Sequence, residues 1–122
     1  MKLMTWNVRG LGRSEKKRAV RRLISKRRCD ILFIQESKIE VVTPRLQRFL
    51  TGHGSLSGEF VSSVGVAGGL ISVWDEQFFT VEEKVSTCRY ILLVGTIKSK
   101  NFRCGLGNIY APNDIEKGKI FG

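Results

Sequence analysis

The first 35 residues hold two apolar segments separated by one amphipathic segment, and this order constrains the fold more than any other feature. Residues 2–8 predict a strand of mixed burial, and the four apolar residues at 31–34 predict a strand buried on both faces. Residues 14–28 between them predict a helix with one apolar face. The apolar positions of that helix are Ala19, Val20, Leu23 and Ile24. A strand, a helix and a strand predict a βαβ unit with parallel strands and a right-handed crossover.

The sequence after Pro44 predicts mainly antiparallel strands. A short helix is expected at 45–50, and the stretch TGHGSLSGEF at 51–60 is typical of a loop. Strands are predicted at 59–64, 69–75, 79–87, 90–98 and 102–110. Because no long helical pattern separates them, short turns should join them. We therefore predict one α/β domain over residues 1–122, with an opening βαβ unit followed by mainly antiparallel strands.

The positive charge is concentrated at the start of the chain. The net charge is +10, and residues 1–28 hold eleven Lys or Arg and one acid, whereas the remaining residues hold ten of each sign. A one-sided basic segment is typical of proteins that bind a polyanion, most often nucleic acid. The alternative is a solvated helix face without a partner.

Neither a membrane span nor a disulfide framework is expected. The longest apolar runs are far shorter than the ~18 residues of a membrane-spanning helix, and the N-terminus lacks the apolar stretch of a secretory signal. Cys29, Cys88 and Cys104 are too far apart for a CxxC arrangement, so we expect free thiols. We therefore expect a soluble, intracellular protein.

Two polar residues follow the predicted parallel strands and should lie at one sheet edge. Asn7 ends the first strand and Glu36 ends the second. Ligands of open α/β sheets bind outside the carboxyl ends of the strands. A carboxylate beside an amide is a suitable half-site for Mg²⁺, which takes one or two carboxylates and shares its remaining positions with water and phosphate. An ordinary solvent-facing strand end is the alternative.

Three motifs resemble those of a known family. MTWNVRGL, DILFIQESK and NIYAPND look like the first three motifs of the endonuclease/exonuclease/phosphatase superfamily, in the family's order. With AGGLISVWD, they are closest to the endonuclease domains of plant LINE-type non-LTR retroelements. The resemblance implies a DNase I-like α/β sandwich of two sheets, one largely from each half of the domain. This chain would then be the N-terminal half.

The resemblance also implies roles for individual residues. Asn7, Tyr110 and Asn113 match residues around the scissile phosphate, and Glu36 matches the residue that binds Mg²⁺ (or Mn²⁺). Arg9 stands where related repair nucleases have an acid, which favours phosphate contact over metal binding. With Arg9, the basic residues expected to contact DNA are Arg13, Lys16 and Lys17. DNA as partner implies a nuclear location.

Two further motifs of the family are missing. The Gly-Asp-Phe-Asn block and the Ser-Asp-His block do not occur, and the lone His53 comes too early in the chain to replace the second. We therefore expect a Mg²⁺-dependent endonuclease-like domain that is incomplete and inactive as this chain. It would expose an apolar face and need a partner or the missing C-terminal half.

Two other interpretations of the sequence remain open beside the endonuclease-like one. One is a non-catalytic, basic, nucleic-acid-binding retroelement remnant, which the charge of the first segment would equally serve. The other is a dinucleotide-binding module, suggested by the stretch RGLGRSE. Glu15 disfavours it, because its negative charge would oppose a pyrophosphate at the helix N-terminus.

Overall fold

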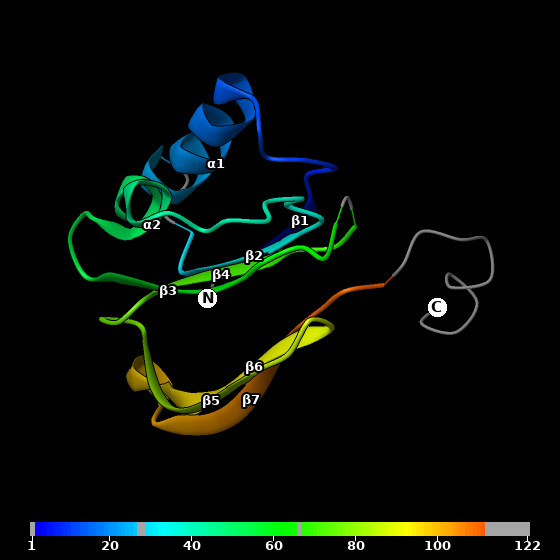
Figure 1. Ribbon diagram of the computed structural model, residues 1–122. Coiled ribbons are helices and arrows are strands. Elements are labelled where there is room, and N and C mark those ends of the chain that lie inside the picture. The colour runs from blue at the N-terminus through cyan, green and yellow to red at the C-terminus, as the bar shows by residue number, and fades with distance from the viewer. Residues whose placement is uncertain (1, 27–28, 66, 112–122) are drawn as a thin grey trace.

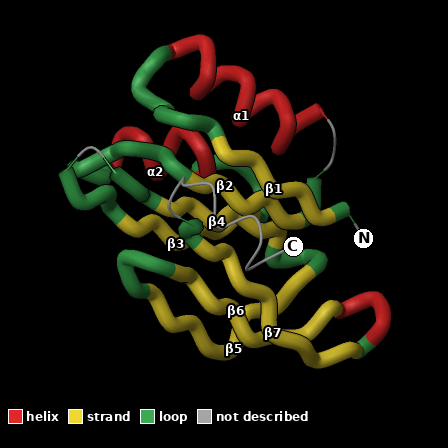
Figure 2. The backbone as a smooth tube through the Cα atoms, turned by 90° about the vertical axis from the view of Figure 1, so that its right-hand side faces the viewer, coloured by secondary structure: helices red, strands yellow, loops and turns green. Residues whose placement is uncertain are grey.

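Two sheets and two helices form three layers (Figure 1). The computed structural model describes residues 2–26, 29–65 and 67–111. Both helices cover one face of the first sheet, and the second sheet covers the other face (Figures 1 and 2). The elements are β1 (Leu3–Asn7), α1 (Ser14–Lys26), β2 (Ile31–Gln35), α2 (Pro44–Thr51), β3 (Leu56–Val61), β4 (Leu70–Asp75), β5 (Phe79–Ser86), β6 (Tyr90–Ile97), the 3₁₀ turn η1 (Lys98–Lys100) and β7 (Phe102–Ile109).

The first sheet contains the predicted βαβ unit. Its strand order is β1-β2-β4-β3, with β1 parallel to β2 and the other neighbours antiparallel. The register pairs Asn7 with Gln35, so the ends of β1 and β2 are level. The second sheet is an antiparallel meander in the order β5-β6-β7. The α/β fold with mainly antiparallel strands after the opening unit is confirmed.

Strand β2 is buried on both faces, as its apolar run predicts. Leu32 and Ile34 pack against the helices with Val20 of α1 and Leu50 of α2. The alternate residues of β2 face the second sheet. This second core contains Ile31, Phe33, Leu70, Trp74, Phe79, Ile91, Leu93 and Ile97. The first sheet thus separates two apolar cores, and β2 runs through the centre of the molecule.

Two sequence-based predictions about the strands were wrong. The resemblance implied one sheet from each half of the domain, but this chain builds strands of both sheets, and their inner faces cover each other. The apolar surface left open is therefore a flank of the sandwich and not a whole sheet face. The stretch 51–60 was expected to be a loop, yet β3 begins at Leu56 because its alternate residues Leu56 and Phe60 pack on the helix-side core.

The three cysteines, Cys29, Cys88 and Cys104, are free thiols, as the sequence predicted. Cys29 is buried, and this burial raises the pKa of its thiol. None of the helices described is long and apolar enough to cross a membrane.

Candidate active site at the end of the parallel strands

Asn7 and Glu36 meet where β1 and β2 end. The Asn7 Nδ2 donates a hydrogen bond of 2.6 Å to Glu36 Oε2, although the residues are 29 apart in the chain. Glu36 is 9% exposed, whereas Asn7 is exposed. The Asn7 Oδ1 accepts from the Arg9 amide at 3.1 Å, which fixes the turn that follows β1. The edge predicted from the two parallel strands therefore exists, and an amide orients its carboxylate.

The backbone around this pair is strained. Arg9, Glu36 and Lys38 have φ values of 51°, 53° and 56°. These values lie in the left-handed region, which residues other than Gly, Asn and Asp rarely adopt. Hydrogen bonds hold them, because Gly10 N–H donates to the Glu36 carbonyl at 2.7 Å and Leu11 N–H to the Ser37 carbonyl at 2.8 Å. Such strain persists only where the surroundings fix it, and it concentrates at functional sites.

A glycine pair before β4 supports the Glu36 segment from the other side. Ser37 N–H donates to the Gly69 carbonyl at 3.1 Å, and Lys38 N–H to the Gly68 carbonyl at 2.9 Å. A Cβ at Gly69 would collide with Ser37 Oγ and approach Lys38 N to 3.1 Å, and Gly69 has φ +91°. Only glycine therefore lets β4 approach the carboxylate loop this closely.

We expect Gly69→Ala to lower the free energy of unfolding by about 2 kcal/mol, because it combines backbone strain with a collision. Gly65→Ala is the matched control, since Gly65 has φ +63° but nothing within 4 Å of an added Cβ. Gly65→Ala should lower the free energy of unfolding by only about 1 kcal/mol, because it adds backbone strain without a collision. Urea unfolding of both variants measures the difference, and equal losses would refute the close approach at Ser37.

Tyr110 reaches the same region from the second sheet. It follows β7, and its N–H donates to the Arg89 carbonyl at 2.7 Å. A Cβ on Gly68 would lie 3.7 Å from the Tyr110 ring, so the ring lies against the glycine pair. The structure thus brings Tyr110 toward the loop that holds Glu36. Asn113, the other residue predicted after β7, lies outside the described residues.

The four predicted DNA-contacting residues lie in and after the turn that follows Asn7. Arg9 and Arg13 are exposed in the turn, and Lys17 is half-buried in the first turns of α1. The Lys16 ammonium donates to the Val8 carbonyl, so this side chain braces the turn. A phosphate contact by Lys16 would have to compete with this bond to the Val8 carbonyl. The sequence did not indicate the bond.

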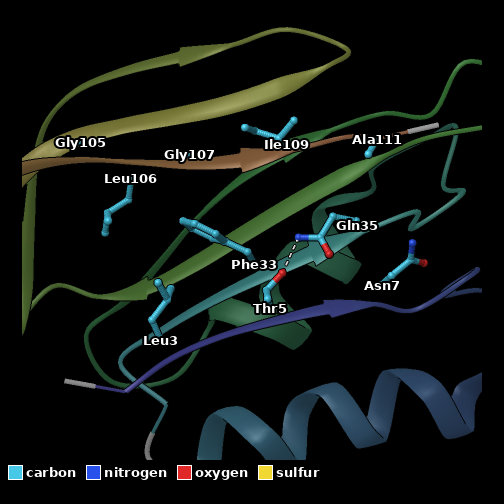
Figure 3. Close-up of a pocket in the computed structure, with 10 residues that line it drawn as sticks. All are labelled: Leu3, Thr5, Asn7, Phe33, Gln35, Gly105, Leu106, Gly107, Ile109 and Ala111. Carbon is cyan, nitrogen blue, oxygen red and sulfur yellow. Dashed lines mark hydrogen bonds between the residues drawn. The ribbon is translucent and has the colours of Figure 1, made fainter. Parts of the chain in front are cut away.

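A polar network between the sheets was not predicted from the sequence. Asn108 of β7 is 1% exposed, and its Nδ2 donates to the carbonyls of Ile34 and Ile71 at 3.2 and 3.0 Å and to Ser72 Oγ at 3.1 Å. Gln35 Nε2 donates to Asn108 Oδ1 and to Thr5 Oγ1, both at 2.8 Å. Since Gln35 precedes Glu36, this network ties the second sheet to the candidate site, and Figure 3 shows its bond from Gln35 to Thr5.

The donor set fits part of a magnesium site. Glu36 supplies one carboxylate, which the Asn7 amide orients, and this suits a hard cation that keeps several waters and shares phosphate oxygens. Within residues 2–26, 29–65 and 67–111, no three His, Cys, Asp or Glu side chains gather as a cation cage. A cation held here would therefore depend on substrate oxygens or on further protein ligands.

Comparisons with known proteins point to one family and one fold. The model of the endonuclease/exonuclease/phosphatase family matches residues 4–98. The AP endonuclease LMAP from Leishmania major superposes with a TM-score of 0.69 at 18% identity, over 95% of this chain and 42% of that one. The APE2 catalytic domain from Xenopus laevis gives 0.65 at 16% identity, over 96% of this chain and 47% of that one.

A third solved structure agrees with these two. The 3′ phosphatase NExo from Neisseria, bound to a product DNA hairpin, gives a TM-score of 0.64 at 20% identity, over 98% of this chain and 46% of that one. No curated protein is significantly similar in sequence. The chain thus spans less than half the length of these three structures, and at such identities the likeness concerns the fold.

Proposed function

The chain belongs to the endonuclease/exonuclease/phosphatase family, and from this premise we propose that its Asn7–Glu36 edge takes part in Mg²⁺-dependent hydrolysis of DNA phosphodiester bonds. The observation that carries the proposal is the 2.6 Å hydrogen bond from Asn7 Nδ2 to the buried Glu36 carboxylate. Burial and a fixed partner hold this carboxylate at a sheet edge that faces outward. That is the arrangement a cation bridging protein and phosphate requires.

Each residue has a distinct part in this proposal. Glu36 would hold Mg²⁺ or Mn²⁺, which when bound neutralises phosphate charge. Asn7 orients the carboxylate, because its amide donates to Oε2 and its own oxygen is engaged by the Arg9 amide. Arg9 and Arg13 supply positive charge beside the edge, and Tyr110 approaches from the second sheet. Asn113 is proposed as a further phosphate contact.

We further propose that the 122 residues alone bind DNA but do not turn it over. The sequence lacks the Gly-Asp-Phe-Asn and Ser-Asp-His blocks, and the three solved structures described above are more than twice as long. General acid–base and positioning groups each contribute about 10²–10⁴-fold to rate. Further polypeptide would have to supply them. We also propose that the domain derives from a plant LINE-type retroelement, which the motif resemblance supports. Because the proposed substrate is DNA, we propose a nuclear location.

A plasmid assay tests this proposal. Purified chain is incubated with supercoiled DNA in Mg²⁺, in Mn²⁺ and in EDTA, and nicked circles and complexes are followed on gels. We expect complexes in all three conditions and no nicking. Mg²⁺-dependent nicking would show that the chain is a complete nuclease and would refute the missing-group argument. Absence of both complexes and nicking would refute DNA as partner.

A non-catalytic, nucleic-acid-binding retroelement remnant, with no hydrolytic role for the Asn7–Glu36 edge, is the second candidate function, and the basic segment favours it. If about four residues contact phosphates, affinity should fall about 10²-fold between 50 and 200 mM salt, because each contact adds about −0.9 to the slope of log K against log salt. Arg13→Ala and Lys17→Ala should each reduce the slope by about 1. Fluorescence anisotropy of labelled DNA at several salt concentrations measures the affinity and its slope against salt.

Lys100→Ala is the matched control for the salt experiment. Lys100 is exposed in η1, which adjoins the Ile97–Phe102 end of the second sheet, whereas Tyr110 follows the opposite end. Its removal should leave the slope unchanged. An equal effect of all three variants would indicate charge-driven binding without a defined surface.

A further inference from the structure

A groove lies on the flank of the sandwich where β3 and β5 are the edge strands. These two edges lie on one side of the molecule, whereas β1 and β7 lie on the other (Figure 2). The groove has a volume of about 420 Å³, and residues of α2, β3, β4 and β5 line it. One of them, Trp74, pairs with Ile31 at the start of β2, whereas Glu36 follows the end of β2. The groove is therefore remote from the candidate active site.

Trp74 brings an unpaired hydrogen-bond donor to this groove. The residue is 3% exposed, and its Nε1–H is buried without an acceptor among the residues that the structure describes. The hydroxyl of Ser57, its partner on β3, donates to Glu76 Oε1 at 2.7 Å instead. Buried indole N–H groups normally find an acceptor, because an unpaired one loses its bond to water without replacement. The free N–H therefore indicates an acceptor that comes from a ligand.

The groove is acidic, although the chain is basic overall. Glu76, Glu82 and Glu83 line it with a single cation, Lys84. Glu82 and Lys84 are each in a salt bridge with a residue outside the groove. Glu76 and Glu83 have no cationic partner within the part of the chain that the structure describes. Both are exposed, so two carboxylates remain for a cation in a chain with a net charge of +10.

The chemistry of the lining selects among ligand classes. Nucleic acid is disfavoured, because its phosphates would meet Glu76 and Glu83. A small amine would pair with these carboxylates but offers no acceptor for the Trp74 N–H. A basic peptide supplies both groups, since its side chain carries the cation and its backbone carbonyl is an acceptor. The methylene groups of that side chain would lie on Leu56 and Val81, which also line the groove.

We propose that this groove binds an extended basic segment of a partner protein, with a lysine or arginine side chain on Glu76 and Glu83 and a backbone carbonyl on the Trp74 Nε1–H. The basic helix α1 of a second copy fits poorly, because its backbone carbonyls are already engaged within the helix. The groove lies away from the Asn7–Glu36 edge, so this binding is independent of DNA hydrolysis.

A peptide titration tests this proposal. The probe is a short synthetic peptide of alternating arginine and glycine, added to the ¹⁵N-labelled chain, and NMR follows the indole signals of Trp6 and Trp74, the two tryptophans of the chain. We expect the Trp74 signal to move downfield as its N–H gains an acceptor, while the Trp6 signal stays. Trp74→Phe identifies the signal by its loss. This variant keeps an aromatic ring but no N–H, so it should bind the peptide about fivefold more weakly.

Glu76→Gln combined with Glu83→Gln should weaken peptide binding about tenfold, because each exposed ion pair contributes a few-fold. Both side chains are exposed, so this double variant keeps the test decisive should Trp74→Phe fail to fold. Glu15→Gln combined with Glu40→Gln is the matched control, since it removes two other exposed carboxylates and changes the net charge equally. The control should bind the peptide as the unchanged chain does.

Three results of the titration would overturn the proposal: equal losses of affinity in both double variants, a Trp74 signal that does not move, or no binding at all. Dimers of the chain in analytical ultracentrifugation would also overturn it, if the Glu76 and Glu83 variant abolished them and the control preserved them. Such dimers would assign the groove to a second copy.

Discussion

Asn108→Ala should lower the free energy of unfolding by about 3 kcal/mol, a large part of the stability of a small domain. Asn108 is 1% exposed and joins β7 to β2 and β4 through Ile34, Ile71 and Ser72. Its removal also leaves Gln35 Nε2 without its bond to Asn108 Oδ1. Urea unfolding followed by circular dichroism measures the loss.

Two comparison variants separate the hydrogen bonds from simple packing. Asn108→Leu restores side-chain volume but no polar atoms, so it should remain almost as unstable as Asn108→Ala. Gln47→Ala removes an amide from the exposed face of α2 and should change stability by less than about 0.5 kcal/mol. If the leucine variant were as stable as the unchanged chain, the network would not be what joins the sheets.

The sequence predicts the Asn7–Glu36 pair because its cause is local. A short apolar strand, an amphipathic helix and a second apolar strand permit one arrangement, with the carboxyl ends of both strands at one edge. The pairing of Asn7 with Gln35 puts Glu36 one residue beyond that edge. The residue that ends one strand and the residue that follows the next therefore meet without any knowledge of the remaining chain.

The network around Asn108 has no such local cause. Gln35 and Asn108 are 73 residues apart and lie in different sheets. How one sheet sits on another depends on the packing of many side chains, which no single segment encodes. The same holds for the division into sheets: the strands after residue 55 were predicted singly, but β3 and β4 join the first sheet whereas β5 to β7 form the second.

Left-handed backbone at Glu36 and Lys38 also escapes a pattern-based analysis. Neither residue type favours positive φ, so the conformation arises from hydrogen bonds to Gly10, Gly68 and Gly69. The one available signal was the glycine pair before β4, which indicates a close backbone approach.

Glu36→Gln should raise the Mn²⁺ concentration needed to occupy the site by about 100-fold, whereas Asn7→Ala should raise it about tenfold. Glutamine keeps the size and the polar contact but removes the charge that a hard cation needs. Asn7 only orients the carboxylate, through the bond from Nδ2 to Oε2. Paramagnetic broadening of the Gly10 and Ser37 amide signals measures occupancy, since both amides lie in the segments that hold Glu36.

Glu40→Gln is the matched control for the Mn²⁺ titration, because Glu40 is an exposed carboxylate four residues further along the chain. It should leave the broadening unchanged, as a lone surface carboxylate holds divalent cations weakly. If Glu36→Gln and Glu40→Gln gave the same curve, Mn²⁺ would be attracted by general charge alone. Broadening that disappears only in Glu36→Gln would identify the buried carboxylate as the metal ligand of this chain, and it would do so without any measurement of DNA cleavage.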